Sequence, residues 1–232
     1  MYKILIPVLF LVFLISCNND STKSKHIHYV KVYENALSMG DVDVAINACY
    51  QIISNDSNQN NYYDSLLALY LNTRSEGSTF LAARNSLKYR PDNFKVTLVA
   101  AEYAKKLGMS DTAINYYKRT YILDKKLEYI YDIAQVQYNM GNDAGAEKSA
   151  DQIISDPNSE KEIIMLSLDK NNPQQIPLKA AALNIKGTIF IGMGSKDIAL
   201  RYFNDALAIA PDFIIAKNNK ADILSGKIKF VK

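Results

Sequence analysis

Apolar and small residues recur at helical spacing along most of the chain, and the clearest stretch lies near the C-terminal end. Leu183, Gly187 and Phe190 are spaced by four and three residues, which places them on one face of a helix. A similar face follows Gly194 and contains Phe203. The pattern predicts two amphipathic helices that pack on each other, with a turn at Gly194 between them.

The same pattern returns with a period close to 34 residues. Small residues recur where two helices would approach closely, and large apolar residues recur where they would fill the space between them. The predicted repeats cover residues 26–59, 60–93, 94–127, 127–160 and 180–213. The repeat at 60–93 is the least regular, because Thr79 stands at one of the small-residue positions and the turn over residues 73–78 is irregular.

The turns between the predicted helices share one chemistry. Gly40, Gly108, Gly141 and Gly194 each stand at the end of a first helix, and Asp, Ser or Asn follows within three residues. Glycine adopts the left-handed conformation that ends a helix, and the polar side chain can accept hydrogen bonds from the first N–H groups of the next one. The turn residues therefore support the helix boundaries independently of the apolar pattern.

This combination of period, small residues and turns resembles the tetratricopeptide repeat, a helix-turn-helix unit. The resemblance implies an all-α fold, a TPR-type α-solenoid of about five repeats within residues 26–232, with a C-terminal capping helix at 214–226. It also implies that the first helix of each repeat lines a groove that binds other proteins. We expect the insertion at 161–179 to break the period, with an apolar part that extends helical packing and a Pro-containing loop.

Carrying the groove positions of the resembled family onto this chain selects a mixed set of side chains. The expected partner-binding residues are Asp64, Glu102, Tyr131, Gln135, Tyr138, Asn184 and Thr188. The Lys and Asn pairing that clamps a C-terminal carboxylate in chaperone-binding relatives is absent. We expect an acidic N-terminal half and an aromatic, amide-rich C-terminal half that holds an extended or helical segment.

The N-terminal residues have the pattern of a secreted, lipid-anchored protein. A short basic start precedes an apolar run over residues 4–15, which as a helix would be about 18 Å long, too short for the roughly 30 Å core of a bilayer. The run ends in Leu14-Ile15-Ser16-Cys17, which resembles the lipobox of bacterial lipoproteins. That resemblance implies a signal peptide at 1–16 and acylation, including palmitate, of Cys17.

Residues 18–25 contain only polar residues, so residues 17–25 are expected to form a lipidated cysteine and a flexible tether. The expected location is the cell envelope, lipid-anchored in the outer membrane and facing the periplasm. An ordinary signal peptide, in which Cys17 has no special role, is the alternative.

Composition and charge limit the classes of function that the chain can have. The chain has 27 basic and 24 acidic residues and no basic cluster, which argues against nucleic-acid binding. We find no catalytic motif, and His26 and His28 have no accompanying ligands, so we expect no enzyme activity, no metal and no cofactor. Cys49 lies in an apolar helical pattern and is expected in the core.

Two functions fit these features. The first is a membrane-anchored scaffold that binds envelope proteins and assists assembly of an envelope or secretion complex. The second is a lipoprotein that binds a glycan or peptide for nutrient uptake. Glycan-binding relatives carry long insertions that form the sugar site, whereas the insertion at 161–179 is short.

Overall fold

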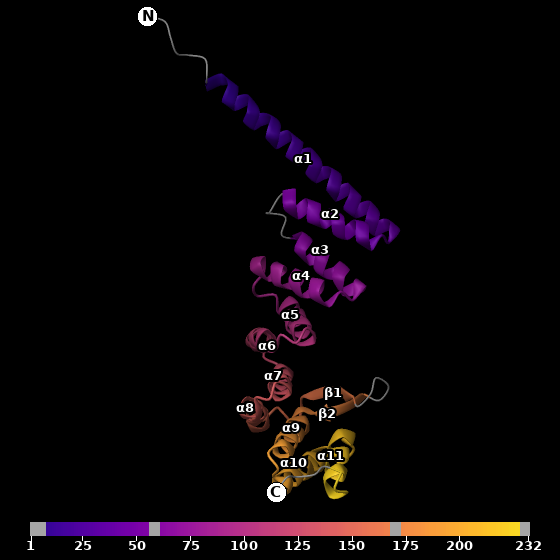
Figure 1. Ribbon diagram of the computed structural model, residues 1–232, viewed down its shortest axis with the longest axis vertical. Coiled ribbons are helices and arrows are strands. Elements are labelled where there is room, and N and C mark those ends of the chain that lie inside the picture. Colours follow the sequence, from indigo (N-terminus) through magenta and orange to yellow (C-terminus); the bar gives the residue numbers. More distant parts are fainter. Residues whose placement is uncertain (1–7, 56–60, 168–172, 228–232) are drawn as a thin grey trace, which may run out of the picture. The chain divides into compact units, whose positions relative to one another are not determined.

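The computed structural model describes residues 8–55, 61–167 and 173–227, with side chains from residue 23 onward. Within these ranges the chain forms eleven helices and two strands, labelled in Figure 1. It divides into two compact units, residues 1–96 and 97–232, which are described separately. The expected all-α, TPR-type fold is confirmed, because the helices follow one another as antiparallel pairs joined by short turns.

The first unit contains two helix pairs and the start of a third. Helix α1 packs against α2, and α3 packs against α4. The elements are α1 (Val8–Met39), α2 (Val42–Asn55), α3 (Asn61–Thr73), α4 (Glu76–Tyr89) and the beginning of α5 (Phe94–Lys106). Cys49 is fully buried on α2, as its apolar surroundings predict.

The second unit continues with three further pairs and a final helix. Its remaining elements are α6 (Ser110–Asp124), α7 (Glu128–Asn139), α8 (Asp143–Ser155), β1 (Ile163–Ser167), β2 (Pro173–Pro177), α9 (Leu178–Gly192), α10 (Lys196–Ile209) and α11 (Ile214–Leu224). Helix α11 packs on α10 and α9, in the place expected for a cap.

Helices α9 and α10 show why the repeat needs small residues. Gly187 of α9 lies directly against the ring of Phe203, a fully buried residue of α10. Ala199 and Ala206 on α10 are also fully buried. These small side chains allow the two backbones to approach while Phe203 fills the space between them.

The turns adopt the conformation that their glycines predict. Gly40, Gly108, Gly141 and Gly194 have φ values of 69°, 71°, 78° and 75°. In the second helix pair, where no glycine is available, Arg74 takes the left-handed conformation with a φ of 57°. A side chain in this conformation is strained, since the left-handed region disfavours residues other than glycine.

Side-chain capping is less uniform than the sequence suggests. Asp41 Oδ1 accepts a hydrogen bond from the Val44 N–H at 3.1 Å, and Asn142 Oδ1 accepts one from the Gly145 N–H at 3.0 Å. Ser195 precedes α10 without making such a bond. Capping therefore supports the starts of α2 and α8, while α10 begins without it.

The insertion at 161–179 differs from the expected helical extension and loop. Residues 163–167 and 173–177 form an antiparallel β-hairpin instead. Ile164 and Ile176 are paired across the two strands and both are buried, whereas the neighbouring Ile163 and Met165 are exposed. This alternation has the period of a strand rather than a helix, and it is the physical reason for the correction.

Residues 17–25 also differ from the expected flexible tether. They belong to α1, which runs without interruption from Val8 to Met39. No glycine or proline occurs between these residues, so no helix-breaking residue stands in the polar segment. Composition alone therefore failed to predict the backbone of this segment.

Candidate peptide-binding groove

Two helices of the second unit bring most of the expected groove residues together. Helix α7 places Tyr131, Gln135 and Tyr138 in one stripe, since they are four and three residues apart. Helix α9, which contacts α7, contributes Asn184 and Thr188 one turn apart. A hollow of about 150 Å³ lies between the helices, lined by Gln135, Tyr138, Asn139, Asn184, Ile185 and Thr188.

Tyr131 lies behind this hollow rather than on its surface. Only 7% of the residue is exposed, and its hydroxyl accepts a hydrogen bond from Gln135 Nε2 at 2.7 Å. Burial raises the pKa of the Tyr131 phenol, so it stays neutral. The sequence predicts that Tyr131 contacts the partner directly, whereas in the structure Tyr131 holds the side chain of Gln135 in its orientation.

The two amide side chains of the hollow are oriented by their neighbours. Gln135 uses its Nε2 on Tyr131, which leaves its Oε1 to accept a further hydrogen bond. Asn184 is only 8% exposed, but it lines the hollow, and its Oδ1 accepts a hydrogen bond from Asn219 Nδ2 of α11 at 3.0 Å, which leaves the Asn184 Nδ2 to donate. These two amides thus offer an acceptor and a donor, the two functions needed to bind the N–H and C=O of a peptide backbone.

The remaining walls of the hollow combine aromatic and apolar surface. Tyr138 is half-buried, and burial followed by the charge of Asp143 raises its pKa, so its hydroxyl remains a neutral donor and acceptor. Ile185 supplies an apolar wall, and the Thr188 hydroxyl donates to the Asn184 backbone carbonyl at 2.9 Å. Such a surface fits an uncharged segment better than a charged one.

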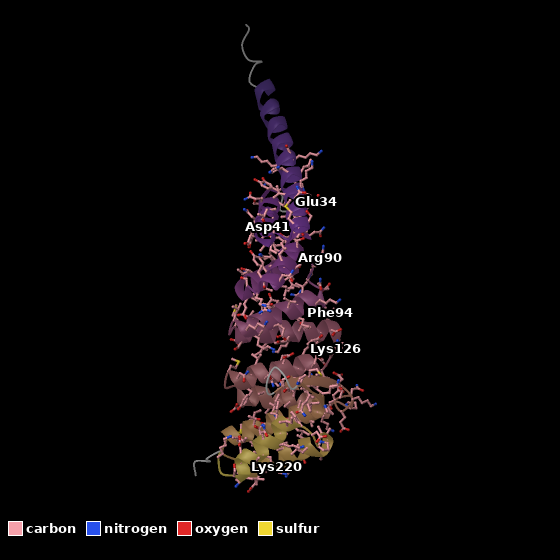
Figure 2. The ribbon with its side chains drawn as sticks, turned by 90° about the vertical axis from the view of Figure 1, so that its right-hand side faces the viewer. Glu34, Asp41, Arg90, Phe94, Lys126 and Lys220 are labelled. Atoms are coloured by element: carbon pink, nitrogen blue, oxygen red, sulfur yellow. The ribbon has the colours of Figure 1, made fainter. Side chains whose placement is uncertain are left out.

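Asp64, expected in an acidic part of the groove, is engaged within the first unit. Its carboxylate accepts hydrogen bonds from Arg90 and from the Ser86 hydroxyl, and Arg90 also contacts Asn61. Arg90, labelled in Figure 2, follows the last residue of α4. Asp64 therefore ties α3 to the end of α4, and Arg90 neutralises its charge.

Glu102, the second expected acidic residue, is similarly occupied. It accepts a hydrogen bond from the Tyr117 hydroxyl and pairs with Lys105 at 3.2 Å. Lys105 also pairs with Asp132 of α7 at 3.1 Å, and burial raises the pKa of Asp132 to about 6 against the opposing charge of Lys105. The prediction of an open acidic part of the groove is therefore wrong, because these carboxylates are paired within the chain.

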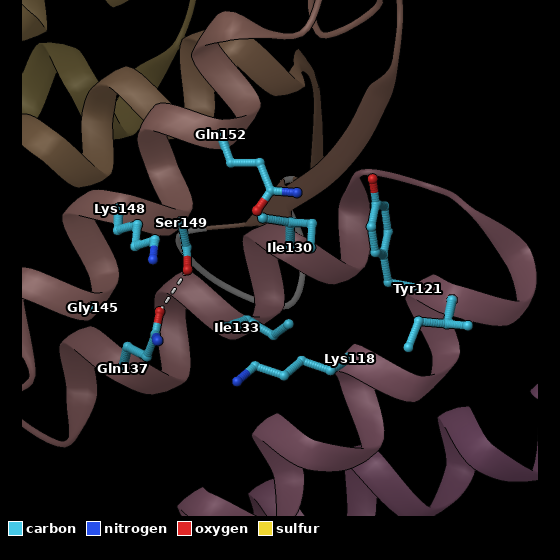
Figure 3. A pocket seen from close by; sticks show the side chains of 10 residues that line it. Lys118, Tyr121, Ile130, Ile133, Gln137, Gly145, Lys148, Ser149 and Gln152 are labelled. Atoms are coloured by element: carbon cyan, nitrogen blue, oxygen red, sulfur yellow. Dashed lines mark hydrogen bonds between the residues drawn. The ribbon is translucent and has the colours of Figure 1, made fainter.

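A larger hollow that the sequence did not reveal lies on a different face of α7. Its volume is about 460 Å³, and Figure 3 shows side chains from α6, α7 and α8 around it. Lys118 and Lys148 line it together with Ile130 and Ile133, and Gln137 accepts a hydrogen bond from the Ser149 hydroxyl at 2.7 Å. The groove positions carried over from relatives lie on the first helix of each repeat, so they do not include residues of the second helices α6 and α8.

The other expected features are partly outside the described residues. Cys17 lies in α1 among the residues whose side chains are not described. Among residues with described side chains, no three His, Cys, Asp or Glu side chains gather closely enough to hold a metal ion. No helix in the described ranges is long and apolar enough to span a membrane.

Comparison with known proteins supports the fold. The sequence profile of the tetratricopeptide repeat matches residues 180–213, the same residues as the repeat predicted above. A comparison with curated protein sequences finds no match.

Among solved structures, YrrB, described as "a TPR protein with an unusual peptide-binding site", is similar with a TM-score of 0.58 and 15% identity, over 89% of this chain and 97% of that chain. The MamA protein is similar with a TM-score of 0.54 and 16% identity, over 90% of this chain and all of that chain. A tetratricopeptide repeat protein from Parabacteroides merdae has a TM-score of 0.55 and 14% identity, over 87% and 73%. At these identities the likeness shows the fold.

Proposed function

We propose that this protein is a lipid-anchored, non-enzymatic scaffold of the bacterial cell envelope that holds a segment of a partner protein between α7 and α9. The bound segment is extended, and its backbone bonds to Gln135 and Asn184. Tyr138 and Ile185 cover its side chains. By this binding the protein assists the assembly of an envelope or secretion complex.

The observation that carries this proposal is the fixed orientation of the two amides. Tyr131 and Asn219 bind Gln135 and Asn184, which both line one hollow, and these bonds leave an acceptor of Gln135 and a donor of Asn184 free for a partner. Side chains held in place before binding lose little entropy when a partner arrives. The similar YrrB protein, itself a TPR protein with a peptide-binding site, is consistent with this use of the fold.

The lipid anchor rests on the N-terminal sequence. A basic start, an apolar run and the box ending in Cys17 occur in the order that lipoprotein processing requires. Several acyl chains on one residue would hold the protein at a membrane, because each buried CH₂ contributes about 0.8 kcal/mol. The outer membrane, with the repeats in the periplasm, is the proposed location.

Substitution of Asn184 tests the groove. In Asn184→Asp, the shape is kept and Asn219 can still donate, but the group that donates to the partner is lost. We expect affinity capture after crosslinking in the native host to recover the partner with the unaltered chain and with Gln137→Glu, a control on another face of α7. Capture should fail with Asn184→Asp. Equal recovery with Asn184→Asp would refute the groove.

Replacement of Cys17 tests the anchor. The unaltered chain should incorporate labelled palmitate and sediment with membranes, whereas Cys17→Ser should do neither. Palmitate incorporation by Cys17→Ser would show that the lipid is attached elsewhere, and no incorporation by the unaltered chain would contradict the anchor. Calorimetry with soluble glycans tests the alternative function. Binding heat from a glycan that Asn184→Asp abolishes would identify the ligand of the hollow as a sugar and favour the uptake function.

A further inference from the structure

The register of the β-hairpin determines which backbone groups of β1 point outward. The Leu178 N–H donates to the Glu162 carbonyl at 2.8 Å, so residues 162 and 178 form a hydrogen-bonded pair. In an antiparallel ladder such pairs alternate, and the next one joins Ile164 to Ile176. The N–H and C=O groups of Ile163 and Met165 therefore point away from β2, toward the outer edge of β1.

The outer edge of β2 is blocked against further pairing. Pro173 and Pro177 occupy two of its three outward positions, so Gln175 supplies the one outward N–H of this strand. The Gln174 side chain accepts from the Ile214 N–H at 2.9 Å and donates to the Asp212 carbonyl at 2.7 Å. Prolines and a tie to the start of α11 thus protect this edge.

Within the described residues, the outer edge of β1 lacks the prolines and charges that often protect an edge strand. Residues 163–167 include no proline and no charge, and Ile163 and Met165 are 49% and 58% exposed. Figure 1 shows β1 on the side of the hairpin away from α11, while β2 contacts α9. An uncharged edge with exposed apolar side chains favours pairing with another strand.

We propose that the outer edge of β1 is a second binding site, which takes an extended segment of a partner protein as a third, antiparallel strand. The segment has apolar residues opposite Met165 and Ile163 and an acidic residue after them. The acidic residue is expected because Lys161, exposed and without an ion pair to any described residue, stands two residues before Ile163. Main-chain hydrogen bonds give the affinity, and the alternating side chains give the selectivity.

A second copy of this chain is a poorer occupant. The strand has five residues, and pairing two such strands would cover far less than the roughly 800 Å² per partner of a stable dimer. A partner segment can be held by an additional contact elsewhere in its own protein. The β1 edge does not depend on the hollow between α7 and α9, so either site can fail without the other.

Amide hydrogen exchange with the full chain tests the proposal. The probe is a short synthetic peptide of alternating threonine and valine that ends in aspartate. In the free protein the amides of Ile163 and Met165 should exchange rapidly, whereas the amide of Ile164 is already protected by β2. Adding the peptide should slow exchange at Ile163 and Met165 and leave Ile164 unchanged.

Two matched proline variants identify the edge. Met165 and Gln175 lie opposite each other, and both have outward amides, so Met165→Pro and Gln175→Pro each remove one outward N–H without removing a bond of the hairpin. Met165→Pro should weaken peptide binding by about tenfold or more, and Gln175→Pro should leave it unchanged. Met165→Lys, which keeps the backbone N–H, should also weaken binding of this apolar peptide.

Three results would overturn the proposal. The first is unchanged exchange at Ile163 and Met165 with saturating peptide. The second is equal binding by Met165→Pro and the unaltered chain. The third is concentration-dependent self-association that Met165→Pro abolishes, because it would assign the edge to a second copy.

Discussion

Replacing Gly187 by alanine should destabilise the packing of α9 on α10. A Cβ atom at residue 187 would lie 2.5, 2.7 and 2.8 Å from three carbons of the Phe203 ring. The ring is fully buried, so it can move away only by displacing its own neighbours. Such overpacking typically costs about 1–3 kcal/mol.

The helix propensity of alanine offsets part of this cost. Alanine is favoured over glycine inside a helix by about 1 kcal/mol. With three ring carbons inside contact distance, we take the upper part of the packing range, so Gly187→Ala should lose a net ~1–2 kcal/mol. The control is Gly192→Ala in the same helix, where no atom lies within 4 Å of the added Cβ. This variant should be neutral or slightly more stable.

Urea denaturation followed by circular dichroism measures both variants in a Cys17→Ser background. Phe203→Leu should destabilise the chain less when Gly187→Ala is already present, because the smaller side chain makes room for the new methyl group. A Gly187→Ala variant as stable as Gly192→Ala would refute the close approach of these helices.

Three other predictions follow from single side chains. The raised pKa of Asp132, about 6, means that the folded chain binds a proton at this carboxylate more tightly than the unfolded chain does. The free energy of unfolding should therefore fall as the pH rises from about 4 to 6, whereas Asp132→Asn should lack this fall. Urea titrations of both chains at several pH values measure the difference. Burial raises the pKa of Cys49 to about 12, so in a Cys17→Ser background iodoacetamide should modify Cys49 slowly in buffer and rapidly in denaturant, as mass spectrometry can follow. Arg74→Gly should stabilise the chain by ~0.5–1 kcal/mol in urea titration, because glycine adopts the left-handed conformation without strain; a loss of stability would contradict this.

The repeat and its helices could be predicted because small residues and turn glycines return in one register. Gly187 and Phe203 illustrate this, since the sequence places one in each helix of a pair and the structure packs them together. The hairpin could not be predicted, because the apolar run of four residues at 163–166 fits a helix or a strand equally well. Only the pairing of Ile164 with Ile176 decides between the two.

The candidate groove could be predicted in position but not in detail. The repeat register places Gln135, Asn184 and Thr188 on facing helices, which is where the hollow lies. The roles of Tyr131 and Asn219 could not be predicted, because they depend on which side chain lies behind which. For the same reason the sequence did not show that Lys105 neutralises Glu102 and Asp132.

Photo-crosslinking in the native host tests the central claim most directly. A photoreactive residue replaces Asn139, which is exposed and lines the hollow between α7 and α9, or Lys118, which is exposed and lines the hollow on the other face of α7. We predict a protein adduct from position 139 that disappears with Asn184→Asp, and no such adduct from position 118. No adduct from position 139, or the same adduct from both positions, would contradict the proposed binding of a partner segment between α7 and α9.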